Sequence, residues 1–153
     1  MRGTALITAS LCLAFLTTAG RAAESASAVS VSARLLPASV AHPPIGVHPG
    51  ARGSFSASFW PLGNMRAARW ALATRKLTGP ALTAHIHTGV PGRNGPILLT
   101  LCRAAPCNLG GSSFHAGLPA EIIRTMRLLG AYVDVHTKKN PRGELRGQIA
   151  FDE

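Results

Sequence analysis

Hydrophobic and polar side chains alternate along much of this chain with a period of two, the pattern of β-strands that bury one face. The segments with this alternation, or with a short apolar run of similar length, cover residues 29–35, 55–59, 68–73, 82–87, 97–102, 131–137 and 145–151. The sequence therefore predicts an all-β fold, an antiparallel β-sandwich or barrel of about seven to eight strands.

One segment has helical periodicity instead. Pro119 suits the first turn of a helix, and Gly130 suits the position just after the last turn. Between them, apolar residues recur on one helical face, namely Ile122, Ile123, Met126 and Leu129. We expect one short helix over about 119–129. A parallel α/β fold is not expected, because helical segments do not alternate with strands.

Turn-forming residues separate the predicted strands, and the chain holds 16 glycines and 11 prolines. Residues 37–53 contain four of the prolines and are expected to form a loop without a helix. Two further turns are expected to be formed by Gly89, Gly92, Asn94 and Gly95, and by Asn140, Pro141 and Gly143. Pro141 takes the second position of a turn, which predicts a C-terminal hairpin. The loop 89–96 precedes a strand rather than a helix, so a phosphate-binding loop is excluded.

The first 22 residues have the features of a secretory signal peptide. Arg2 supplies a positive start, residues 5–19 are apolar and uncharged, and Gly20 and Ala22 fit the small positions before a cleavage site. The apolar run is short for a membrane-spanning helix, and no later segment is long enough. We expect a secreted or periplasmic protein with no transmembrane span in its mature chain.

Charge and aromatic content bear on the partners of such a protein. Sixteen Lys and Arg face six Asp and Glu, and loss of Arg2 and Arg21 with the signal peptide leaves 14 against six, a net charge of +8. The arginines form no dense run, and the chain has only five Phe, two Trp and one Tyr. Nucleic acid is therefore not an expected partner. An extracytoplasmic ligand, either a protein or an anionic surface polymer, is expected, and the alternative is that the charge only favours solubility.

Export also bears on the cysteines. Cys102 and Cys107 are the two that remain after cleavage, and an oxidising compartment favours a disulfide between them. A loop this short gains roughly 2 kcal/mol from the cross-link. A thiolate metal site would need further soft ligands nearby.

Three histidines and an aspartate occupy outward positions on two predicted strands. Ile86 is the natural core residue of its strand, so His85 and His87 face outward. On the later strand two valines take the core face, which leaves Asp134 and His136 outside. If the two strands are neighbours, the three imidazoles meet on one surface.

Such a cluster gives the hypothesis of a metal site with His85, His87 and His136 as ligands. Asp134 would accept a hydrogen bond from a ligand imidazole, and His115 beside the helix could reach the cluster from outside. Imidazole ligands suit copper or zinc better than calcium or magnesium. Three alternatives stay open: the histidines bond only to loops such as 89–96, they bind another ligand, or Asp134 is a solvated surface charge.

Motifs for catalysis are missing from the sequence. No serine lies in a Gly-x-Ser-x-Gly context, and no catalytic residue is identified. Glu144 is expected to form a surface salt bridge with Arg142 or Arg146.

Two blocks of the sequence resemble the signatures of a known family. Residues 84–97 read Ala-His-Ile-His-Thr-Gly-Val-Pro-Gly-Arg-Asn-Gly-Pro-Ile, and residues 132–149 run from Tyr-Val-Asp-Val-His to Arg-Gly-Gln-Ile. They are similar to the first and second signatures of the CHRD domain, which is named from chordin and is widespread in secreted microbial proteins. The resemblance places a CHRD domain at 29–153. The family usually has Glu before its Val-Pro-Pro element, whereas this chain has Ala41-His42 before Pro43 and Pro44.

The resemblance implies a non-catalytic extracytoplasmic binding or structural module, because the family has no defined enzymatic activity. Growth-factor binding by chordin does not carry over. A weaker likeness to the layout of copper,zinc superoxide dismutase, with outward histidines on a β-barrel, supports the alternative of a mononuclear copper or zinc protein. Counterparts of the bridging histidine and the zinc aspartate are missing, so a dinuclear dismutase site is not expected.

Overall fold

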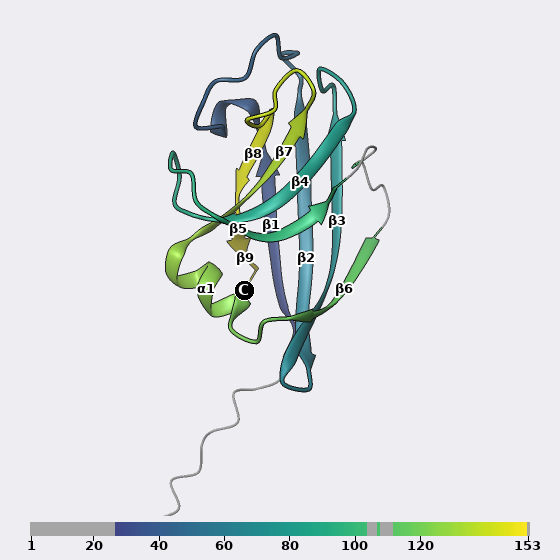
Figure 1. Ribbon diagram of the computed structural model, residues 1–153, viewed down its shortest axis with the longest axis vertical. Helices are drawn as coiled ribbons and strands as arrows, with labels where there is room; N and C mark the ends of the chain where they lie inside the picture. The colour runs from purple at the N-terminus through teal and green to yellow at the C-terminus, as the bar shows by residue number, and fades with distance from the viewer. Residues whose placement is uncertain (1–26, 104–106, 108–111, 153) are drawn as a thin grey trace, which may run out of the picture.

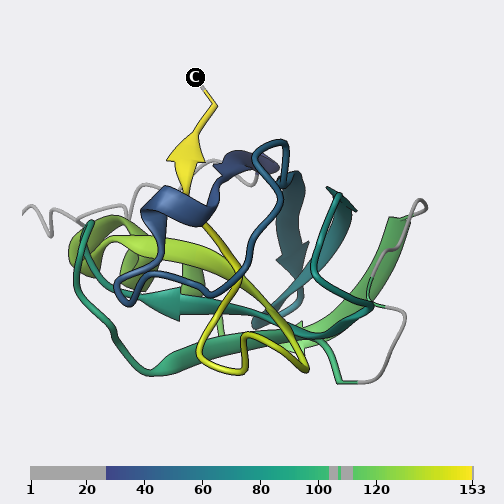
Figure 2. The same ribbon diagram turned by 90° about the horizontal axis from the view of Figure 1, so that it is seen from above.

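Two antiparallel sheets pack face to face in the computed structural model of the chain (Figures 1 and 2). The structure describes residues 27–103, 107 and 112–152, so the predicted signal peptide lies outside the described residues. The prediction of an all-β sandwich with one short helix is confirmed for the part of the chain that is described.

The first sheet has five strands in the order β6-β3-β2-β1-β9. Its strands are β1 (Val29–Leu35), β2 (Arg52–Leu62), β3 (Met65–Arg75), β6 (Ser112–Leu118) and β9 (Ala150–Phe151). The second sheet has four strands in the order β5-β4-β7-β8. Its strands are β4 (Ala81–Thr88), β5 (Ile97–Cys102), β7 (Ala131–Thr137) and β8 (Leu145–Gln148).

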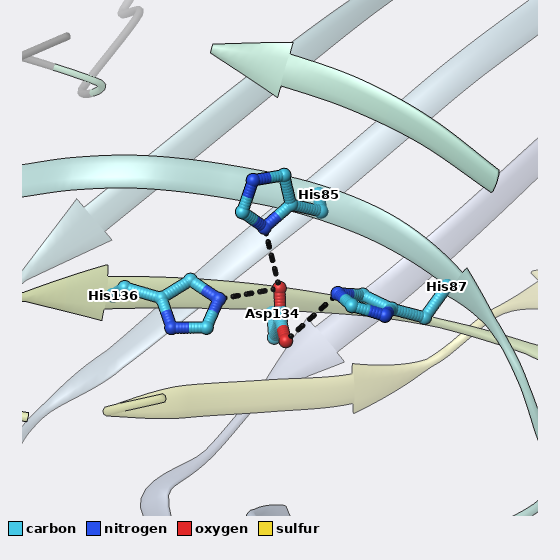
Figure 3. Close-up of side chains that lie close together, drawn as sticks. All are labelled: His85, His87, Asp134 and His136. Carbon is cyan, nitrogen blue, oxygen red and sulfur yellow. Dashed lines mark ion pairs between the residues drawn. The ribbon is translucent and has the colours of Figure 1, made fainter. Parts of the chain in front are cut away.

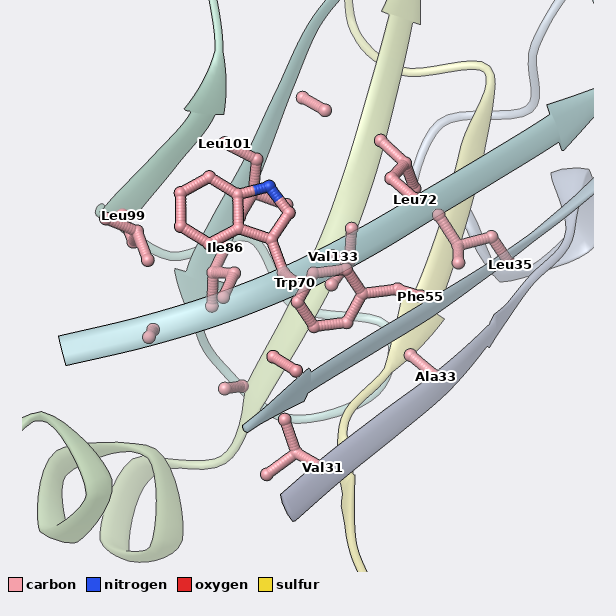
Figure 4. Packing of buried hydrophobic residues seen from close by; sticks show 14 of the residues in the cluster. Val31, Ala33, Leu35, Phe55, Trp70, Leu72, Ile86, Leu99, Leu101 and Val133 are labelled. Atoms are coloured by element: carbon pink, nitrogen blue, oxygen red, sulfur yellow. The ribbon is translucent and has the colours of Figure 1, made fainter. Parts of the chain in front are cut away.

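The core lies between the sheets and is built by the predicted alternation. Val31 and Phe59 of the first sheet are fully buried, as are Ile86 and Val133 of the second. Ile86 and Val133 also pair across β4 and β7, so they fill the same level of the core (Figure 4). The polar residues between these positions point to the outer faces of the sandwich.

The strands differ from the prediction in extent and number. β2 and β3 extend beyond the predicted ranges 55–59 and 68–73, since Pro61 still pairs with Arg66, and the chain reverses at Gly63, where φ is 59°. β6 was not predicted, because Ser-Ser-Phe-His-Ala-Gly-Leu has no regular alternation. Tertiary pairing with β3 alone makes this segment a strand.

The last predicted strand, residues 145–151, is divided between the two sheets. Residues 145–148 pair with β7, whereas Ala150 and Phe151 pair with β1 in the other sheet. The backbones of Leu36 and Arg146 bond to each other in both directions, at 2.9 and 3.1 Å, beside this crossing. The two sheets are therefore joined along this side, and period two alone cannot reveal the change of sheet.

The helix α1 (Ile122–Leu129) is shorter than expected. Pro119 lies in the preceding turn, where its carbonyl accepts a hydrogen bond from the Ile122 N–H at 3.1 Å. Ile122, Ile123 and Met126 are buried, but Leu129 is 55% exposed, which corrects its placement on the buried face. The loop 37–53 also holds one 3-10 turn, η1 (Pro37–Ser39), where no helix was expected.

The predicted disulfide between Cys102 and Cys107 is present, with the two Cα atoms 5.8 Å apart. Cys107 is fully buried, and its N–H donates to the Ala81 carbonyl at 3.0 Å. The bridge therefore holds Cys107 at the end of β5, and the hydrogen bond holds Cys107 at the start of β4. Over the residues that the structure describes, no helix has the length and apolar character needed to cross a membrane.

Replacing Ile86 with alanine should lower the free energy of unfolding by about 2–5 kcal/mol, because it opens a cavity between the sheets. Denaturation by urea, followed by circular dichroism, measures the change. Leu82→Ala on the same strand is the control, since Leu82 is 38% exposed and should cost less than about 1 kcal/mol. Equal losses in the two variants would contradict this description of the core.

Candidate metal centre

The pairing of β4 with β7 brings the predicted cluster together. In the antiparallel register His85 lies opposite Asp134, and Thr83 lies opposite His136. His87 sits two residues along β4 on the same face as His85. The expectation that the two histidine strands are neighbours is confirmed, and all four side chains lie on the outer face of the second sheet (Figure 3).

The Asp134 carboxylate lies between the three imidazoles. Its Oδ1 is 3.0 Å from His136 Nε2 and 3.4 Å from His85 Nδ1, and its Oδ2 is 3.2 Å from His87 Nε2. One ligand atom from each of the four residues lies within 4.8 Å of the others. Asp134 is therefore in contact with all three rings, and it is 8% exposed rather than a solvated surface charge.

Two backbone carbonyls orient the imidazoles. His87 Nδ1 lies 2.8 Å from the Gly95 carbonyl, and His136 Nδ1 lies 3.0 Å from the Pro141 carbonyl. A carbonyl only accepts, so each Nδ1 carries a proton, and Nε2 is the nitrogen that faces Asp134. In the neutral form of either ring this Nε2 holds the lone pair. The loop contacts expected as an alternative to metal binding are present, but they use only one nitrogen of each ring.

The inner atoms of the cluster are sheltered from water. The side chains of His85, His87 and His136 are 13–16% exposed. Among the described residues, their inner nitrogens and Asp134 Oδ1 are buried atoms without a well-formed hydrogen bond. Buried polar atoms of this kind are costly unless a further group satisfies them.

The electrostatics of the cluster follow from burial and close contact. Burial alone raises the pKa of Asp134, but the facing imidazoles of His136 and His87 outweigh it and hold that pKa well below its usual range. Burial likewise lowers the pKa values of His87 and His136, yet contact with Asp134 raises both above the usual value. Burial lowers the pKa of His85, aided by the other two rings. Asp134 is therefore an ionised carboxylate that attracts positive charge.

Arg146 fixes the loop that carries the Gly95 carbonyl. Its guanidinium donates to Asn94 Oδ1 at 3.1 Å and to the carbonyls of Val90 and Arg93 at 3.2 and 2.6 Å. The same guanidinium lies 3.4 Å from the centre of the Tyr132 ring, a cation–π contact. Arg146 therefore fastens the loop 89–96 to the strand that bears Asp134.

Tyr132 completes this support on the side of His87. The two rings stack with centres 4.9 Å apart and planes 3° from parallel, and the Tyr132 hydroxyl accepts a hydrogen bond from the Gly95 N–H at 3.2 Å. A Cβ at Gly95 would overlap the Thr88 carbonyl oxygen, so the loop approaches this closely only with glycine there. The predicted turn glycine thus has a direct role in placing His87.

A buried carboxylate organises the turn beside His136. Glu144 is fully buried, which corrects the expected surface salt bridge with Arg142 or Arg146. It accepts hydrogen bonds from the Thr78 N–H at 2.7 Å, the Thr137 hydroxyl at 2.6 Å and Asn140 Nδ2 at 3.2 Å, and also from the Thr78 hydroxyl. The turn closes with the Gly143 N–H donating to the Asn140 carbonyl at 3.1 Å, with Pro141 at its second position as predicted.

His115 is the one predicted site residue that the fold does not bring to the cluster. It lies on β6 in the other sheet, where its ring packs 5.9 Å from the ring of Trp70. Tyr132 and Arg146, conversely, were not predicted as parts of the site. The outward position of Arg146 opposite Asp134 in the hairpin was the available signal.

The comparison with protein families identifies the family of this chain. The CHRD domain matches residues 31–149, most of the chain. The chain belongs to the CHRD family. The matched range includes His85, His87, Gly95, Asp134 and His136. No curated protein and no solved structure matches the chain significantly.

Membership in the CHRD family supports a non-enzymatic extracellular module in general, as the resemblance implied. Three imidazoles and one carboxylate around a common point also form a donor set that can hold a metal ion.

Glu144 should make the stability of this protein pH-dependent. Burial alone raises its pKa, but hydrogen bonds from Thr137, Thr78 and Asn140 outweigh it and lower the pKa below the usual value. Its stabilisation is thus complete above the unfolded pKa of about 4.3 and is lost as the pH falls through the lower folded value. Glu144→Gln should cost about 1–3 kcal/mol at pH 7, with a smaller difference from wild type at pH 3.

Urea denaturation of both proteins across this pH range measures that difference. Glu121→Gln, at the exposed start of α1, is the control and should cost less than about 1 kcal/mol. A difference between Glu144→Gln and wild type that grows as the pH falls would contradict the assignment.

Proposed function

We propose that this CHRD module binds a single Zn²⁺ or Cu²⁺ ion through three imidazoles and a carboxylate. The ligand atoms are His85 Nδ1, His87 Nε2, His136 Nε2 and one oxygen of Asp134. The observation that carries the proposal is the orientation of His87 and His136, whose outer Nδ1 atoms bond to backbone carbonyls while their inner Nε2 atoms face the ionised carboxylate of Asp134. A cation between the four side chains would give each of these ligand atoms a bonding partner.

The distances in the cluster suit this role. Four ligands at about 2.0–2.1 Å from a tetrahedral ion lie roughly 3.3 Å from one another. The contacts from Asp134 to the three nitrogens are 3.0–3.4 Å. The widest separation, up to 4.8 Å, calls for inward movements of roughly 1 Å. The carbonyls behind His87 and His136 would fix the ring tautomers that metal ligation needs.

The proposed ion has a structural and binding role. It would join β4 to β7 on the outer face, and it would hold the loops at 89–96 and 140–143 that frame the cluster. This role agrees with a non-catalytic module outside the cytoplasm, in a secreted or periplasmic protein. We also propose that this module has a partner outside the cytoplasm, which is either a protein or an anionic surface polymer.

Removal of one ligand should abolish stoichiometric binding. We expect about one Zn²⁺ or Cu²⁺ per purified chain by elemental analysis and titration calorimetry, and an affinity at least about 100-fold weaker in His87→Ala. His42→Ala is the matched control, because His42 is exposed in a loop and should leave affinity unchanged. Equal metal content in wild type and His87→Ala would reject the site.

Metal binding should also raise thermal stability. At a free metal concentration of about 100 times Kd, the bound ion adds about 2.7 kcal/mol to the free energy of unfolding. The melting temperature of the wild type should therefore rise with added Zn²⁺, whereas that of Asp134→Asn should rise much less. A metal-dependent rise that is the same in both proteins would place the ion elsewhere.

A further inference from the structure

The outer face of the five-stranded sheet carries a groove that the proposed metal site does not use. Its floor consists of small outward side chains on β1, β2 and β3, which are Ser30, Ser32, Ser54, Ser56, Ser58, Ala71 and Ala73. Larger residues stand at the ends of this floor. The small side chains thus lie between larger charged and aromatic side chains at the two ends of the groove.

One end of the groove is cationic. A hollow of about 560 Å³ is lined by Arg34, Arg52 and Arg75 around Ser54 and Ala73. Arg52 and Arg75 lie directly opposite each other on β2 and β3, an arrangement of like charges that is unfavourable without an anion. This end is therefore suited to a carboxylate or sulfate group, which guanidinium binds in a bidentate manner.

The other end combines hydroxyl groups with an aromatic ring. A second hollow of about 720 Å³ is lined by Ser56, Ser58, Trp60, Arg69 and neighbouring residues. Trp60 lies beside Phe114 with ring centres 6.0 Å apart, and Phe114 is 58% exposed. Such a surface offers hydrogen bonds together with an apolar ring face.

The charges along the groove are not neutralised within the described residues. Arg34, Arg69 and Arg75 are exposed, and none of them forms an ion pair with a described acidic side chain. Arg52 donates only to the Gly50 carbonyl, at 3.1 Å. Among the described residues, Asp152 is the one carboxylate that lines either hollow, and it accepts a hydrogen bond from the Ser32 hydroxyl at 2.9 Å.

The two hollows follow each other along the same strand. Arg52 and Trp60 mark the ends of the groove on β2, eight residues apart, which corresponds to about 26 Å of strand. A ligand that uses both ends must be extended, bear anionic groups, and carry hydroxyl groups along its length.

We propose that this face binds a linear acidic polysaccharide of the polyuronate type. The arginines pair with its carboxylates, the serine hydroxyls bond to its sugar hydroxyls, and Trp60 packs against a sugar ring. A protein partner fits less well, because the floor lacks the large apolar anchors of protein interfaces. Nucleic acid also fits less well, because the described residues of this face offer a single aromatic pair, Trp60 and Phe114, for base stacking.

Calorimetry of the purified protein with polygalacturonate oligomers tests the proposal, with dextran as the neutral polymer. We expect binding to polygalacturonate that weakens with added salt, and none to dextran. The double variant Arg34→Gln/Arg75→Gln should bind about tenfold more weakly. Arg103→Gln/Arg124→Gln removes the same charge from exposed positions outside the groove and should bind like the wild type.

Three results would overturn the proposal: no binding to polygalacturonate, equal losses in the two double variants, or tighter binding of duplex DNA through the same arginines. Circular dichroism confirms that each variant is folded. His87→Ala should keep the affinity for polygalacturonate, so the result is independent of the metal site.

Discussion

The antiparallel pairing of β4 with β7 is the interaction on which the candidate site depends. Its register places His85 opposite Asp134 and Ile86 opposite Val133, so one set of backbone bonds builds the core and the cluster together. A slip of one residue would turn the imidazoles into the apolar interior and the aliphatic side chains into water. The burial of Ile86 and Val133 therefore holds the histidines in position, although the side chains of these two residues lie on the opposite face of the sheet.

The histidine cluster on the outer face of that sheet is largely shielded from solvent, and buried polar contacts of the neighbouring loops explain this shielding. Arg146 fastens the loop 89–96 over His87, while Glu144 fastens the turn 140–143 beside His136. Each of these charged groups is buried, and each has its hydrogen bonds satisfied by backbone or side-chain partners. Because a half-satisfied buried charge is costly, the two contacts couple the site to the stability of the C-terminal hairpin.

The outer faces of the two sheets thus differ in their chemistry. The four-stranded sheet supplies histidines and a carboxylate around one point, which suits a cation. The five-stranded sheet supplies arginines and small hydroxyl side chains along 11-residue strands, which suits an extended anion. The hydrophobic core separates these two faces.

Local pattern accounts for the strands, the outward histidines, the disulfide and the proline turn, because each depends on the parity or identity of nearby residues. Parity could not show that β8 and β9 belong to different sheets, or that Ser112–Leu118 is a strand, since both follow from partners distant in the chain. The same holds for Glu144. An isolated Glu between Gly and Leu has the composition of a surface position, and only the convergence of Thr78, Thr137 and Asn140 gives it a buried set of donors. Contact of Asp134 with all three imidazoles likewise arises from the packing of two strands, a long-range property that residue spacing does not encode.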